Sequence, residues 1–276
     1  MNDSAPPLMS ASQMWNALAL QRKWFPPHYV GLDDVDFSRP ALWVANHTVY
    51  GVLDAPMLVA EIYQRHGVLL RSLADRAHFA VPAWRDMLAA GGCIVGTPEN
   101  CSQLMQQGHH VLVFPGGGRE VAKRKGEEHQ LVWKNRTGFA RMAIEHGYPI
   151  IPVAQLGADD ALTITVDAND LMQTTVGDMI RDNRLLNRLT RGGDMLFPLV
   201  RGVAGLPIPR PHPFWFHIGT PIPTDLYNPD DDDDRWMLRE IVAQSILDAM
   251  DQLRQLREQH QASNPAGPLR SLLQRL

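Results

Sequence analysis

The chain has 276 residues, of which 45% are hydrophobic and 20% charged; this suits one large or two small domains and excludes a disordered chain. A net charge of −4 argues against nucleic acid as the main partner. The two cysteines, Cys93 and Cys101, have no metal-ligand spacing, which predicts a reduced, cytosol-facing compartment. The sequence has no long apolar run, and its start, MNDSAPPLMS, lacks the pattern of a secretory signal. We therefore expect neither a membrane-spanning helix nor a cleaved leader.

The first predicted element is a helix from Leu8 to Trp24. Its large apolar residues and the cluster Gln21–Lys23 fit a helix that lies on a membrane interface. An ordinary amphipathic helix packed on the domain explains the same pattern, so both interpretations stay open. A loop or short strand is expected from Tyr29 to Pro40.

A short apolar run, Ala41–Ala45, has the length and composition of a buried strand, and Asn46 and His47 follow it. Thr48 is a good N-cap residue, so we expect a helix to begin there and to run to His66. His47 would then lie at the junction of a strand and a helix, where open α/β sheets place ligand-handling groups. An imidazole can accept a proton there, although a helix-capping or packed histidine would have the same position.

Strands and helices then alternate along the chain. The predicted strands are Val68–Leu73, Gly91–Gly96, His110–Phe114, Ile150–Ala154 and Phe214–Gly219. The predicted helices are His78–Ala90, Thr97–Gly108, Gly138–His146 and Arg235–His260. The proline- and glycine-rich stretch Met195–Pro213 is either a covering loop or a wall of an apolar channel that touches lipid. This alternation predicts an α/β fold with a central, mostly parallel sheet and helices on both faces.

Three successive glycines, Gly116, Gly117 and Gly118, come directly after the strand that ends at Phe114. Glycine lets the backbone approach a ligand closely, which makes this loop a candidate binding element. The basic cluster Lys123–Lys125 follows. It predicts contact with anionic headgroups or phosphates, although exposed lysines are usually only solvated.

Four motifs, taken in order and in their secondary-structure context, resemble the glycerolipid acyltransferase superfamily. They are Asn46-His47 after a strand, FPGGGRE (114–120) after another, KNRTGFARMA (134–143) before IIPV (150–153), and Arg210-Pro211 with IGTPI (218–222). The glycine-rich loop and the GFARMAIEHG segment look most like the mono- and diacylglycerol acyltransferase branch and its plant phytyl-ester synthase relatives. The resemblance covers about Leu42 to Ile222. We therefore expect an N-terminal amphipathic helix and lead-in over 1–40, an acyltransferase domain over 41–225, and a C-terminal helix and tail over 226–276.

What the resemblance implies is transfer of a fatty acyl group from a thioester, acyl-CoA or acyl carrier protein, to a lipid hydroxyl, without a metal or other cofactor. His47 would be the general base that removes the hydroxyl proton. The N–H groups of Gly116–Gly118 would bind the developing oxyanion or a phosphate. Arg119 matches the motif arginine that contacts the acceptor's phosphate in the phospholipid branch, and Asn46 would join this loop in binding substrate.

Two positions depart from the family pattern. The family usually has an aspartate five residues after the histidine to orient the imidazole, and this chain has Val52 there. Asp54 and Glu120 are the two candidate replacements as partners of His47. Gly116 stands where the phospholipid branch carries glutamate, which favours a neutral alcohol over a lysophosphatidate acceptor.

Two other functions stay open. A hydrolase would use His47 to activate water, although the sequence lacks the G-x-S-x-G elbow of serine hydrolases. A non-catalytic lipid-binding protein would explain the missing acid at Val52. For an acyltransferase we expect membrane lipids and the acyl donor as partners, and a cytoplasmic, peripheral location on the inner face of the membrane.

Overall fold

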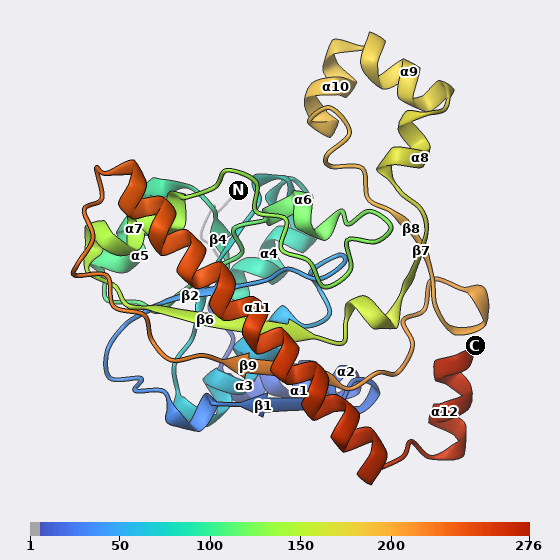
Figure 1. Ribbon diagram of the computed structural model, residues 1–276, viewed down its shortest axis with the longest axis horizontal. Coiled ribbons are helices and arrows are strands. Elements are labelled where there is room, and N and C mark those ends of the chain that lie inside the picture. The colour runs from blue at the N-terminus through green and yellow to red at the C-terminus, as the bar shows by residue number, and fades with distance from the viewer. Residues whose placement is uncertain (1–5) are drawn as a thin grey trace.

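A seven-stranded sheet in the order β1-β9-β6-β2-β5-β3-β4 forms the centre of the molecule (Figure 1). The computed structural model describes residues 6–276, so residues 1–5 of the predicted lead-in lie outside the described residues. The strands of this sheet are β1 (Pro27–Val30), β2 (Leu42–Ala45), β3 (Arg71–Ala74), β4 (Ile94–Val95), β5 (Val111–Val113), β6 (Ile150–Leu156) and β9 (Phe214–Ile218). Neighbouring strands are parallel except β6 and β9, which confirms the predicted mostly parallel sheet.

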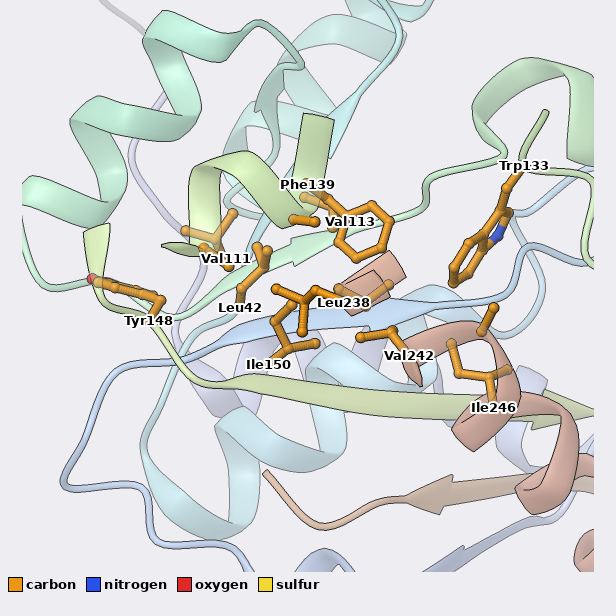
Figure 2. Packing of buried hydrophobic residues seen from close by; sticks show 14 of the residues in the cluster. Leu42, Val111, Val113, Trp133, Phe139, Tyr148, Ile150, Leu238, Val242 and Ile246 are labelled. Atoms are coloured by element: carbon orange, nitrogen blue, oxygen red, sulfur yellow. The ribbon is translucent and has the colours of Figure 1, made fainter. Parts of the chain in front are cut away.

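Helices cover both faces of the sheet because alternate side chains of the buried strands point to opposite sides. Leu42 and Val44 of β2 belong to a core with α5 (Pro98–Gln106), α7 (Gly138–His146) and α11 (Asp232–Ser263). Trp43 and Ala45 belong to a second core with α1 (Ala11–Ala17) and α3 (Ala55–His66). Figure 2 shows the first core, in which Leu238, Val242 and Ile246 of α11 lie against the strands. The prediction of helices on both faces is confirmed.

The helix after β2 begins at Ala55, so the predicted start at Thr48 is wrong. Asp54 is the N-cap instead, and its carboxylate accepts a hydrogen bond from the Ala55 N–H at 2.8 Å. The residues in between form a turn in which Tyr50 and Gly51 both have a φ of 61°. The connection between the strand and the helix is therefore longer than the capping signals indicate.

The predicted helix Leu8–Trp24 consists of two shorter helices, α1 and α2 (Ala19–Trp24), which meet at Leu18. Met14 of α1 is buried, and α1 packs against α3. This arrangement supports the interpretation of α1 as a helix packed on the domain.

A second, two-stranded sheet carries a projecting part of the chain, which we call the lobe (residues 163–201). Its elements are β7 (Thr163–Val166), α8 (Ala168–Met172), α9 (Thr175–Asp182), α10 (Arg184–Thr190) and β8 (Leu199–Arg201). The three helices of the lobe lie away from the central sheet (Figure 1). The remaining helices are α4 (Pro82–Ala90), α6 (Gly117–Val121) and α12 (Pro268–Arg275). Across residues 6–276, no helix combines the length and the apolar character needed to cross a bilayer.

The packing of α11 on the sheet makes a stability prediction. Leu238 has no exposed surface, so Leu238→Ala leaves a cavity and should lower the free energy of unfolding by about 2–5 kcal/mol. Urea unfolding followed by circular dichroism measures this loss. Leu226→Ala, at a side chain that is 84% exposed, is the matched control and should change the free energy by about 0.5 kcal/mol or less. Equal effects of the two substitutions would contradict the packing described.

Candidate active site

The carboxyl ends of β2 and β5 meet at one edge of the sheet because the two strands are parallel neighbours. His47 follows β2, and the glycine-rich loop follows β5. The imidazole of His47 stacks on the ring of Phe114, with 4.0 Å between the ring centroids and 14° between the planes. The structure therefore brings His47 next to the residue that opens the glycine-rich loop.

Asn46 fixes the point at which the chain leaves β2. Its side-chain amide donates to the carbonyl of Gln155 at 3.0 Å and accepts from the Gln155 N–H at 2.7 Å. The side chain of Gln155 in turn donates to the carbonyl of Asn46 at 2.7 Å. Because the Asn46 amide is buried and bonded within the protein, it positions His47 and leaves substrate contact to other groups.

The imidazole of His47 is neutral at pH 7. Burial chiefly, and then nearby Lys123 and His78, lower the pKa of His47 to about 3. Its Nδ1 is buried and has no hydrogen-bond partner in the part of the chain that the structure describes. The ring can thus accept a proton but has no carboxylate to stabilise the charged form.

Gly51 lies directly against the edge of this ring. A Cβ atom at Gly51 would lie 2.7 Å from Nδ1 of His47 and would also overlap Cε1. The positive φ of Gly51 is a second reason why this position favours glycine. A side chain at position 51 would therefore displace the imidazole of His47.

Glu120 lies near the main-chain N–H group of His47. Burial raises the pKa of Glu120 to about 7, while Lys123 and the main-chain N–H groups of His47 and Val132 act in the opposite direction. The Val132 N–H donates to the carboxylate at 3.4 Å. Glu120 has no exposed surface, so it holds the loop of His47 from inside the protein.

Asp54, the other candidate acid, has its carboxylate on the α3 N-terminus. Burial raises the pKa of Asp54 to about 6, and the nearby Thr48 hydroxyl and the Ala55 N–H oppose this rise. Within the described chain, neither Asp54 nor Glu120 forms a hydrogen bond or an ion pair with the imidazole of His47.

A buried ion pair supports the turn that follows His47. Lys123 and Asp159 are 1% and 4% exposed, and their charged groups lie 3.7 Å apart. The Asp159 carboxylate also accepts from the N–H groups of Val49 at 2.7 Å and His129 at 3.0 Å. Because Lys123 is buried and paired, the predicted contact of the basic cluster with lipid or phosphate is wrong for this residue.

The glycine-rich loop forms the first turn of α6 and is packed by protein groups. A Cβ atom at Gly116 would overlap the Glu120 carboxylate, and one at Gly118 would lie 2.5 Å from the sulfur of Met195. The Arg136 guanidinium donates to the carbonyl of Gly116 at 2.5 Å. Gly117 has a φ of 48° and donates its N–H to Phe114 at 2.9 Å. Packing against Glu120 therefore favours glycine at 116, the positive φ favours it at 117, and the flexible end of Met195 could shift away from a Cβ at 118.

Arg119 is buried beside the loop and is occupied by carboxylates. Its guanidinium makes two hydrogen bonds with Glu127, one of them at 2.9 Å, and its Nε lies 3.6 Å from Asp194 of the lobe. The Asp194 carboxylate also pairs with Arg124, at 3.5 Å, and with Lys134. The charge of Arg119 is therefore neutralised inside the protein.

The structure gathers His47, Glu120 and the glycine-rich loop, and it gives Asp54 and Arg119 other partners. The positioning residues that sequence reasoning missed are Gly51, Gln155 and Asp159. A glycine shortly after the candidate base is a signal for close approach, whereas Gln155 and Asp159 contact the loop from far along the chain. Within residues 6–276, no group of three or more His, Cys, Asp and Glu side chains is placed to hold a metal ion.

Residues 27–155 match the family model described as Acyltransferase. The chain is 32% identical over 208 residues to phytyl ester synthase 1, chloroplastic, of Arabidopsis thaliana, which covers 70% of this chain and 29% of that protein. It is 31% identical over 144 residues to the "DGAT1/2-independent enzyme synthesizing storage lipids" of Bos taurus, covering 52% of this chain and 42% of that protein.

The chain thus spans less than half the length of these two relatives. Among solved structures, it aligns with the 1-acyl-sn-glycerophosphate (LPA) acyltransferase PlsC of Thermotoga maritima at 14% identity and a TM-score of 0.49, over 87% of this chain and 79% of that one. The matched segment 27–155 contains His47, the glycine-rich loop and Glu120. Residues 27–155 are thus similar to the acyltransferase family.

Proposed function

We propose that the chain is an O-acyltransferase that moves a fatty acyl group from an acyl thioester, acyl-CoA or acyl carrier protein, to a lipid hydroxyl, with His47 as the general base. The match of residues 27–155 to the acyltransferase family, and the similarity to lipid acyltransferases, support acyl transfer to a lipid. The observation that carries the assignment of the base is the neutral, unpaired imidazole beside the glycine-rich loop. A lipid hydroxyl is presented at a bilayer surface, so the proposal includes peripheral attachment to the cytoplasmic face of a membrane.

In the proposed reaction, the hydroxyl oxygen attacks the thioester carbonyl carbon while Nε2 of His47 takes the hydroxyl proton. The carbonyl π electrons move to oxygen, and the Gly116 and Gly118 N–H groups are the candidate donors to this oxyanion. Collapse of the tetrahedral intermediate breaks the carbon–sulfur bond, and the imidazolium gives its proton to the leaving thiolate. A low imidazole pKa favours this last transfer, because a thiolate binds a proton more tightly.

The environment of Arg119 bears on the acceptor. A guanidinium group without a protein partner would suit a phosphate. The guanidinium of Arg119 instead makes hydrogen bonds with Glu127 and lies close to the carboxylate of Asp194. Gly116 also places no acidic side chain on the loop. Both observations support a neutral lipid alcohol as the acceptor.

Removal of the base is the direct test. His47→Ala should lower kcat for acyl transfer from acyl-CoA to a long-chain alcohol or diacylglycerol by about 100-fold or more, because it removes the proposed proton acceptor. Thin-layer chromatography with a labelled acyl chain measures the ester product.

His109→Ala is the control. His109 precedes β5 and so lies at the amino ends of the strands, away from the candidate site, and its substitution should leave kcat unchanged. Full turnover of the His47→Ala protein would refute the assigned base. Release of free fatty acid by the wild type without any alcohol would indicate a hydrolase. Tight binding of acyl-CoA without turnover would indicate a lipid-binding protein.

Gly51→Ala should lower kcat by about 100-fold, because the added methyl group displaces the imidazole from its place beside the loop. The methyl group also strains the left-handed backbone at this position. Gly67→Ala is a matched control, since Gly67 has a φ of 70° and no atom within 4 Å of an added Cβ. Both variants strain a left-handed backbone, and only Gly51→Ala, whose Cβ would also overlap His47 and Val121, should lose activity. Equal activity of the two would contradict the role of Gly51.

The raised pKa of Glu120 makes a pH prediction. Native Glu120 holds its proton up to about pH 7, whereas the unfolded side chain releases it near 4.5, so the native state binds more protons in this window. The contribution of Glu120 to the free energy of unfolding is therefore lost as the pH rises from 4.5 to 7. The stability of the wild type relative to Glu120→Gln should fall across this range in urea unfolding. A difference in stability between the wild type and Glu120→Gln that does not change with pH would contradict the raised pKa of Glu120.

A further inference from the structure

The outer helices of the lobe leave large apolar side chains uncovered. Val176 and Met179 of α9 are 46% and 62% exposed, and Leu185 and Leu189 of α10 are 65% and 66% exposed. Their spacings, three and four residues, place each pair on one face of its helix. The two helices pack on each other and lie at the outer end of the lobe, away from the central sheet (Figure 1). Exposed apolar residues that cluster in this way mark a contact surface.

The segment that forms α9 and α10 has a net positive charge, opposite in sign to that of the whole chain. The whole sequence has a net charge of −4, whereas residues 175–191 carry four arginines and two aspartates. Arg181 pairs with Asp178 at 2.6 Å, and Arg191 pairs with Asp75 at 2.9 Å.

Arg184 and Arg188 are exposed and have no ion-pair partner among residues 6–276. They lie four residues apart on α10, beside Leu185 and Leu189. A surface with unpaired guanidinium groups next to uncovered leucines complements a partner that is both apolar and negatively charged.

We propose that α9 and α10 insert into the headgroup layer of an anionic lipid bilayer. Val176, Met179, Leu185 and Leu189 contact the acyl chains, and Arg184 and Arg188 contact lipid phosphates. A bilayer satisfies the apolar and the basic side chains together. A second copy of the chain would bring like charges face to face, and an acidic soluble protein would leave the four apolar side chains without a role.

The lobe also contacts the candidate site, through residues that follow α10. Met195 lies against Gly118, and the hydroxyl of Tyr50 donates to the carbonyl of Pro198 at 2.7 Å. Vesicle binding requires no acyl transfer, so this inference and the proposed function can fail independently.

Cosedimentation with lipid vesicles tests the proposal on the full chain. The wild type should bind vesicles of mixed phosphatidylglycerol and phosphatidylcholine, should bind pure phosphatidylcholine more weakly, and should lose binding as salt is added. Leu185→Glu/Leu189→Glu should lower the partition coefficient by about tenfold or more. Arg184→Gln/Arg188→Gln should lower it by about tenfold and flatten its salt dependence.

Two other exposed leucines provide matched controls. Leu226→Glu changes a side chain that is 84% exposed in a turn outside the lobe and should bind as the wild type does. Leu20→Glu changes a side chain of α2 that is 83% exposed, so it tests the N-terminal helix as the membrane contact. All variants should unfold at the wild-type temperature because the altered side chains are exposed.

Three results would overturn the proposal. The first is wild-type vesicle binding by Leu185→Glu/Leu189→Glu. The second is loss of binding by Leu20→Glu alone, which would assign the contact to α2. The third is a wild-type dimer, seen by sedimentation velocity without vesicles, that the Leu185→Glu/Leu189→Glu protein cannot form; this would make a second copy of the chain the occupant.

Discussion

The buried hydrogen bonds between Asn46 and Gln155 determine where β2 ends, and the candidate site depends on that point. Each bond contributes only about 1 kcal/mol net, but leaving either buried amide unpaired costs about 1–3 kcal/mol. A slip of β2 against β6 by one residue would leave these amides unpaired and would move the strand's side chains to the wrong faces. The amides therefore specify the register that puts His47 beside Phe114 and the glycine-rich loop.

Buried charges then hold the loop that carries His47. Lys123, Asp159 and Glu120 are nearly or fully buried, which is unfavourable for isolated charges. Here the two carboxylates accept hydrogen bonds from main-chain N–H groups, Asp159 from Val49 and Glu120 from Val132. The positive charge of Lys123 also disfavours an imidazolium at His47. The same groups that fix the loop thus keep the candidate base neutral.

The parts of the fold that the sequence predicted follow from local patterns. The strand before His47 could be predicted because a strand buried on both faces is a continuous apolar run. The position of His47 near the glycine-rich loop could be predicted because the carboxyl ends of parallel strands meet at the same end of the sheet. The start of α3 could not be predicted, because Thr48 and Asp54 are both good N-cap residues and only the tertiary packing decides between them. The burial of Lys123 could not be predicted either, since its partner Asp159 is brought near only by the folded sheet.

The pairing of β1 with β9 has a consequence for synthesis of the chain. β1 lies at an edge of the sheet, and its neighbour β9 comes near the other end of the sequence. During translation, the strand Pro27–Val30 leaves the ribosome long before Phe214–Ile218 exists. Its unpaired N–H and C=O groups are then open to wrong strands or to chaperones. Completion of the sheet is a late event, and a message broken before the codon of Phe214 yields a chain that lacks the only neighbour that β1 has within the described sheet.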